Sequence, residues 1–152
     1  MAGPTFYWED FAAGDTRLLG PRVVTAEEIM EFARQFDPQD FHVDGEHARH
    51  SSFGGLVASG WHTCSLAMRL VCDGYLLRTA SVGSPGVDKI RWKLPVRPGD
   101  ALSVRTSVLE TRRSASRPGT GIVRFHWDIQ NQCGQSVAEL ETTGIFRCRS
   151  RG

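Results

Sequence analysis

The second half of the sequence alternates apolar and polar residues with a period of two, and this pattern constrains the fold more than any other feature. In 122–130, for example, every second residue from Val123 to Ile129 is apolar, as in a strand with one buried face. Four such segments follow one another: 87–96, 101–110, 122–130 and 136–146. The stretches "RPGD", "SRPGTG" and "QCGQ" between them are typical of turns, so we predict four strands in an antiparallel meander.

The first half of the sequence predicts one short strand and two helices. The strand covers 16–24, with an interruption at Gly20-Pro21. The first helix starts after Thr25, which forms a capping box with Glu28, and ends at Asp37 because a residue before proline is disfavoured in a helix. The second helix covers 60–77 and is apolar over most of its circumference, which is typical of a buried helix.

These elements predict an α+β fold: an antiparallel β-sheet wrapped around a central buried helix, the hot-dog arrangement. The length of 152 residues suits a single domain over 1–152. Such a sheet leaves an edge strand free, and pairing with a second copy covers an edge most simply. We therefore expect a homodimer, or a higher homo-oligomer.

The composition of the chain indicates which kinds of binding partner and which cellular compartment to expect. The formal net charge of +1 gives no basic excess for nucleic acid, and no apolar run approaches the roughly 18 residues that cross a membrane. The N-terminal residues lack a basic segment followed by an apolar one, so we expect a cytoplasmic protein, or one of an organelle matrix. The four cysteines show no CxxC spacing, which favours reduced, mostly core residues.

The candidate site lies in the loop after the first predicted helix. Asp37 and His42 stand five residues apart on this loop, and a carboxylate with an imidazole can serve as base and acid. The loop leads to Gly60 at the predicted start of the second helix, where free N–H groups can bind a developing oxyanion. Taken singly, Asp37 also fits a turn residue before proline, and His42 a packed or surface histidine.

Two further sets of residues, a group of histidines and a group of basic residues, could either bind a ligand or be ordinary surface residues. His47 and His50 are one helical turn apart near His42 and Asp44, but no second cluster or cysteine ligand joins them, so we predict no metal site. Basic residues on strands and loops fit solvated faces, although an arginine cluster can also hold phosphates. These basic residues are Lys89, Arg91, Lys93, Arg97, Arg112, Arg113 and Arg117.

Several stretches, in this order, resemble the MaoC-like hydratases, the group that includes R-specific enoyl-CoA hydratases. They are "YWEDFAAGD", "FDPQDFHVD", "SSFGGLVASGWH" and "RWKLPVRPGDAL". The family pattern is Asp-x-Asn-Pro-x-His, followed eighteen residues later by a glycine at the head of the central helix. Asp37, His42 and Gly60 match that pattern and spacing. The sequence departs from it at Gln39 and Asp40, where the family usually has Asn and Pro, and at Met68, where the well-known hydratases have serine.

The resemblance implies a function. Asp37 and His42 would hold and activate water, and the Gly60 N–H would bind the thioester oxygen. The expected reaction is hydration of 2-enoyl-CoA to (R)-3-hydroxyacyl-CoA, or the reverse dehydration, with an acyl-CoA substrate and no cofactor. The alternatives are a hot-dog acyl-CoA thioesterase and a non-catalytic acyl-CoA-binding subunit.

Overall fold

A computed structural model describes residues 2–150 as a five-stranded antiparallel sheet with helices on one side. The strands are β1 (Thr16–Val23), β2 (Ser81–Trp92), β3 (Ala101–Arg113), β4 (Thr120–Gln130) and β5 (Ser136–Arg147). The α-helices are α1 (Ala26–Phe36), α2 (Asp40–Val43), α3 (Gly45–Arg49) and α4 (Gly60–Gly74), and the 3-10 turns are η1 (Trp8–Asp10) and η2 (Leu76–Arg78). None of the helices in this part of the chain is both long and apolar enough to cross a membrane.

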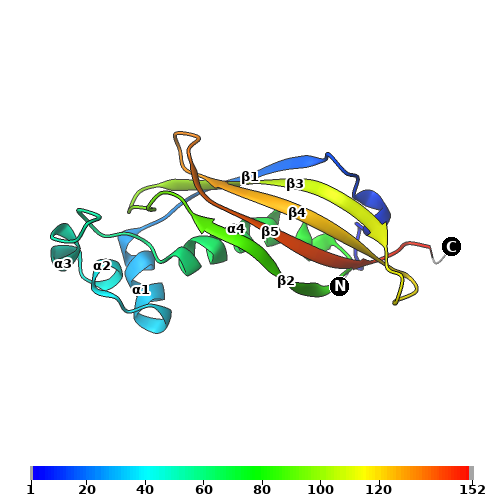
Figure 1. The fold of residues 1–152 in the computed structure, drawn as a ribbon, viewed down its shortest axis with the longest axis horizontal. Coiled ribbons are helices and arrows are strands. Elements are labelled where there is room, and N and C mark those ends of the chain that lie inside the picture. The colour runs from blue at the N-terminus through cyan, green and yellow to red at the C-terminus, as the bar shows by residue number, and fades with distance from the viewer. Residues whose placement is uncertain (1, 151–152) are drawn as a thin grey trace.

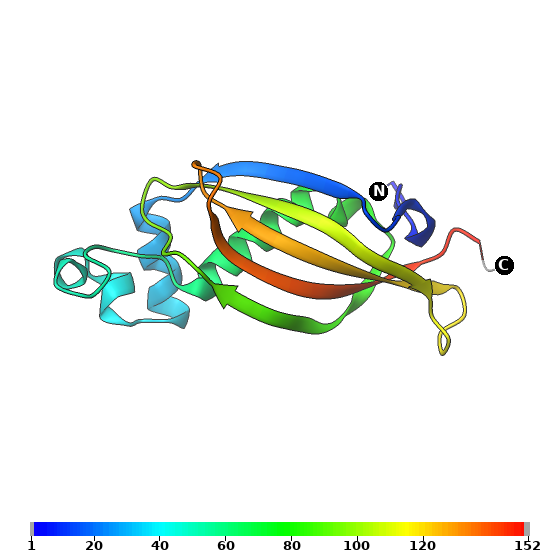
Figure 2. The same cartoon turned by 45° about the horizontal axis from the view of Figure 1, so that its top comes forward.

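The sheet curves over α4, and the three other helices gather at the end where α4 begins (Figures 1 and 2). Along β4 buried residues alternate with partly exposed ones, as the period of two predicts. The inward residues pack on the buried face of α4, where Leu66, Ala67 and Val71 join the same core. The predicted α+β arrangement, a sheet wrapped around a helix, is therefore confirmed.

The predicted four-strand meander is wrong at its first strand. The order in the sheet is β1-β3-β4-β5-β2, so only β3, β4 and β5 form a meander. The link from β2 to β3 is not a tight turn: Lys93 and Leu94 donate to Val137 of β5, and Val96 accepts from Ala58 next to α4. These contacts carry the chain across the end of the sheet, so β2 lies at the edge beside β5 and β1 takes the place beside β3.

β2 also departs from its predicted extent and alternation. It begins at Ser81 instead of Val87 and ends at Trp92, with almost every residue exposed. Three register shifts interrupt its pairing with β5, and Lys89 has a positive φ of 56°. These irregularities break the period of two, so Trp92 and Leu94 are exposed.

The predicted helices are largely confirmed. The capping box of Thr25 and Glu28 is present, and α1 ends at Phe36. The second helix ends at Gly74, earlier than predicted, and only one of its faces is buried: Trp61 and Met68 are 56% and 40% exposed. The cysteines are free, but they are not mostly core residues as predicted: Cys64 packs against the core, while Cys133 is exposed.

His62 of α4 is buried between this helix and α1. Its ring stacks on Phe32 at 4.7 Å, and its Nδ1 has no hydrogen-bond partner within the described residues. Burial lowers the pKa of His62, and Arg22 adds to that effect while Glu28 opposes it. The folded protein therefore favours the neutral imidazole.

This burial makes stability depend on pH. In the unfolded chain the histidine pKa is about 6.5, so below that pH the unfolded state binds a proton that the folded state resists. We expect the free energy of unfolding to be fully retained above that pH and to fall as the pH drops through it toward the lowered pKa of His62. Urea unfolding of the wild type and of His62→Phe measures this free energy as a function of pH. The measurements cover about pH 5 to pH 8, the range in which histidines titrate. An identical pH dependence in both proteins would contradict the assignment.

Candidate functional site

Asp37 and His42 come from two different elements and meet. Asp37 is the C-cap of α1, where its N–H donates to Ala33, while His42 lies on α2. His42 Nε2 is 3.3 Å from Asp37 Oδ2, and the two side chains are only 8% and 18% exposed. The structure thus brings the predicted pair together, although His42 lies on a short helix and not on the irregular loop that the sequence predicts.

A backbone contact fixes the tautomer of His42. Its Nδ1 lies 2.6 Å from the carbonyl oxygen of Val57, which can only accept a hydrogen bond. Nδ1 therefore carries a proton, and Nε2 is the nitrogen that gains or loses one beside Asp37. This geometry allows one mobile proton to pass between a carboxylate and an imidazole.

Gln39 holds the carboxylate of Asp37 from its other side. Gln39 Nε2 donates to Asp37 Oδ1 at 2.7 Å, so this residue makes an amide contact despite its departure from the family's asparagine. Partial burial alone would raise the pKa of Asp37. The hydrogen bonds from Gln39 and Ser59 and the charge of His42 outweigh it, so the pKa lies below its ordinary value. Asp37 is therefore ionised at neutral pH.

Asp40 turns away from the pair. Its Oδ2 lies 3.3 Å from Nε2 of His47 on α3, and both side chains are largely exposed. The second carboxylate is thus solvated and faces another histidine. Its charge is screened from Asp37 and His42 by water.

Gly60 is the first residue of α4, so its N–H has no partner within the helix. Ser59 precedes it as a fully buried N-cap whose hydroxyl accepts from Trp61 N at 3.3 Å. Val57 links this helix start to α2, because its N–H donates to Phe41 and its carbonyl contacts His42. These contacts orient the α4 N-terminus and the His42 ring toward the same space.

A cavity of about 310 Å³ occupies that space, and both His42 and Gly60 line it. The other walls include Thr63 of α4, Trp92 at the end of β2 and Lys93 in the link after it. The site therefore presents a proton-exchanging pair, a free helix N–H and a mostly apolar enclosure.

Sequence reasoning missed three contributors to the site. Ser59 and Val57 act through a buried hydroxyl and a backbone carbonyl, whose roles depend on tertiary contacts. Trp92, at the end of β2, is 48% exposed and lines the cavity. No pattern in the sequence marks this role, because Trp92 stands among the alternating apolar residues of the predicted strand over 87–96.

Comparison with known proteins identifies the family. The family described as "MaoC like domain" matches residues 10–125, which is most of the chain. The chain belongs to the MaoC-like domain family. The recognition made from the sequence is thereby confirmed.

Proteins similar to this MaoC-like chain include a relative of matching length and solved structures with the same fold. An uncharacterised protein of Bacillus subtilis (strain 168), YdeM, is 27% identical over 91% of this chain and 97% of its own. The solved MaoC-like dehydratase from Rhodospirillum rubrum is 40% identical, with a TM-score of 0.84 over 95% of this chain and 99% of that one. An R-hydratase from Pseudomonas aeruginosa has the same fold at 21% identity, with a TM-score of 0.73 over 95% and 87%.

The histidines considered as metal ligands lie apart from the site of this MaoC-like chain, whereas one of the basic residues lines it. His47 of α3 pairs with Asp40 of α2, and His50 pairs with Glu46, and all four side chains are largely exposed. Within residues 2–150, no three His, Cys, Asp or Glu side chains are arranged to hold a metal ion. Among the basic residues, Lys93 lines the cavity and pairs with Glu139 at 3.2 Å.

Proposed function

We propose that the protein hydrates a 2-enoyl-CoA to the (R)-3-hydroxyacyl-CoA, or catalyses the reverse dehydration. Family membership supports hydration or dehydration as the class of reaction. The observation that carries the proposal is the contact between Asp37 and His42, with the His42 tautomer fixed by Val57. His42 of this pair lines the same cavity as Gly60, whose N–H at the start of α4 is suited to bind a thioester oxygen.

In the proposed reaction, a water molecule is held beside the contact between Asp37 and His42, within reach of both side chains. The pair takes one proton from the water, whose oxygen bonds to C3 of the substrate, and a proton is returned to C2. The electron pair of the C=C bond passes through an enolate, and the Gly60 N–H and the α4 dipole stabilise its oxygen. Dehydration follows the same steps backward.

We propose that no metal or redox cofactor takes part. The addition of water moves protons and leaves the net oxidation state of the substrate unchanged, so a base, an acid and an oxyanion donor suffice. The CoA thioester is the substrate and supplies the polarised carbonyl. Membrane and nucleic acid have no part in this reaction, and we propose a cytoplasmic location.

We further infer that the protein forms a homodimer. β1 and β2 are the edges of the sheet, and β2 exposes Val82, Val87 and Trp92. An exposed edge with apolar side chains is covered when two copies associate. A larger assembly of such dimers is compatible with this arrangement.

Two assays of the wild-type protein distinguish the proposed reaction from its alternatives. We expect crotonyl-CoA to lose its conjugated absorbance without release of thiol. Release of free CoA, detected with a disulfide reagent, would instead indicate a thioesterase. Binding of acyl-CoA by calorimetry without either reaction would indicate a non-catalytic subunit.

A further inference from the structure

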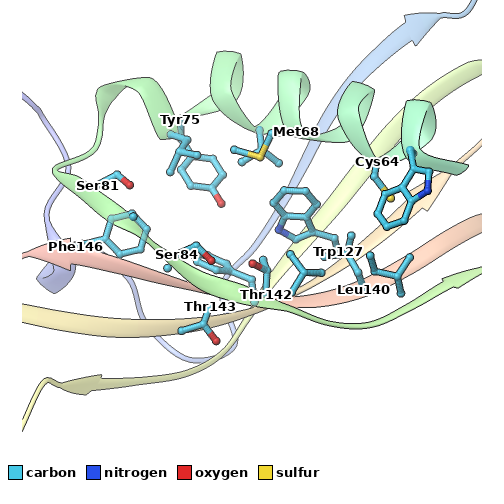
Figure 3. A pocket seen from close by; sticks show the side chains of 18 residues that line it. Cys64, Met68, Tyr75, Ser81, Ser84, Trp127, Leu140, Thr142, Thr143 and Phe146 are labelled. Carbon is cyan, nitrogen blue, oxygen red and sulfur yellow. The ribbon is translucent and has the colours of Figure 1, made fainter. Parts of the chain in front are cut away.

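The helix α4 faces a different neighbour on each of two opposite sides. On one side Cys64 and Tyr75 project toward the sheet across a cavity of about 400 Å³ (Figure 3). His62 lies two residues before Cys64, which is about 200° around the helix axis, and its ring packs on Phe32 of α1. The first turn of α4 is therefore in contact with the helix that carries Asp37 at its end.

The last turn of α1 has little buried surface of its own. Ala33 is fully buried, whereas residues 34–36 are exposed. Phe32 precedes Asp37 by five residues, about 7.5 Å along the helix axis, and its ring is stacked on His62. The two ring centroids are 4.7 Å apart at an interplanar angle of 10°. This stack is thus one of the last packing contacts of α1 before the chain reaches Asp37.

The surroundings of His62 suit a neutral ring and oppose a charged one. His62 is 6% exposed, and its Nδ1 has no hydrogen-bond partner within the described residues. A proton on Nδ1 would bury both a charge and an unpaired N–H group, and each is costly. Two charged groups act on the ring from the elements packed around it: Arg22 of β1 opposes the proton and Glu28 of α1 favours it. These two groups pair with each other at 3.2 Å, so burial decides the preference for the neutral ring.

We propose that His62 is a positioning residue: its neutral ring, stacked on Phe32, holds the end of α1 with Asp37 against the start of α4, and a proton on His62 releases that end. This inference rests on the proposed function and adds to it a residue that acts through Asp37 and not on the substrate. His62 follows Gly60 by two residues, so the stack fixes the Asp37 carboxylate relative to the oxyanion donor. A displacement of about 1 Å between such groups can slow a reaction by about a hundredfold.

Amide hydrogen exchange measures the release of α1 without any reaction. A histidine in the released form has a pKa of about 6.5, so at about pH 5 its protonation favours release by up to about thirtyfold. We expect the protection factors over residues 26–37 to fall by about five- to thirtyfold between about pH 8 and about pH 5. Protection of the buried residues of β4 should be at least about tenfold higher at both pH values, because release of one helix end costs less than global unfolding.

Two substitutions of His62 separate the ring from its charge. His62→Phe keeps a flat ring that can stack on Phe32 but binds no proton, so the protection of α1 should no longer fall at low pH. His62→Ala removes the ring, so protection of α1 should be low throughout the pH range. His126→Phe is the matched control: His126 is a partly exposed residue of β4 that pairs with Glu139, and the wild-type fall should persist in this variant. Circular dichroism confirms that each variant is folded.

Kinetics at about pH 8, where the histidine is neutral, test the consequence for the site. We expect His62→Ala to lower kcat for crotonyl-CoA by about tenfold or more with little change in KM, because Asp37 is misplaced while Gly60 still binds the thioester. His62→Phe should retain the wild-type kcat, since the stack is kept. A loss confined to kcat and rescued by a flat ring is not expected of a residue that only stabilises the fold.

The outcomes separate this inference from the proposed function. If crotonyl-CoA is hydrated but His62→Ala retains the wild-type kcat, the positioning role is wrong and hydration stands. If α1 is released as expected while no enoyl-CoA reacts with the wild type, hydration is wrong and the hold of His62 on α1 stands. A pH-dependent fall that persists in His62→Phe, or equal protection of α1 and β4, would overturn the release of α1 by a proton on His62.

Discussion

Replacement of Asp37 by Asn is expected to lower turnover of crotonyl-CoA by about two or more powers of ten, the usual contribution of a general acid or base. Asparagine retains the size of the side chain and can still contact Gln39, but it cannot accept a proton from water beside His42. The fold should persist because Asp37 is a C-cap whose helix contact is made by its backbone N–H. Initial rates from the loss of conjugated absorbance measure the effect.

The partner change His42→Ala should lower turnover to a similar extent. The double variant should be little slower than either single one, because the two groups act as a unit. Asp73→Asn and His50→Ala are matched controls, since both residues are exposed and form ion pairs away from the cavity. Unchanged rates in both Asp37→Asn and His42→Ala would eliminate the proposed mechanism, whereas loss in the controls would indicate damage to the fold.

Gly60→Ala should reduce kcat/KM for crotonyl-CoA by about a hundredfold, comparable to the loss of one oxyanion donor. An added Cβ would lie 2.3 Å from Cε2 of Trp92, so the indole has to move. The new methyl group also stands beside the N–H that the thioester oxygen must approach. Steady-state kinetics over a range of crotonyl-CoA concentrations give this value.

A matched control for this change is available at Gly45. It too is the first residue of a helix, α3, and an added Cβ there meets nothing within 4 Å. We expect Gly45→Ala to retain wild-type kinetics. The double variant Gly60→Ala with Trp92→Ala removes the clash but keeps the methyl group. Recovery of full activity in that double variant would assign the loss to the displaced indole and not to blocked access to the Gly60 N–H.

Local patterns in the sequence were enough to predict most elements. Three of these patterns act within a few residues and can therefore be recognised without tertiary information. They are the alternation in β4, the capping box of α1 and the proline after Asp37. The strand that pairs with β2 could not be predicted from the sequence. The place of β2 beside β5 depends on how the link after Trp92 packs on Val137 and Ala58. Its pairing is a long-range property that turn residues do not encode.

For the site, the family pattern placed Asp37, His42 and Gly60 in the sequence, and their spacing predicted that they meet. The contact between Asp37 and His42, the Val57 carbonyl that sets the tautomer, and the opposite directions of Gln39 and Asp40 required the folded chain. Hydrogen bonds to backbone carbonyls and side-chain directions depend on packing between elements distant in sequence. The sequence by itself therefore determined which groups are available for chemistry. The tertiary structure decided how they are oriented, protonated and enclosed, because those properties arise from contacts that form only when α1, α2 and α4 pack together.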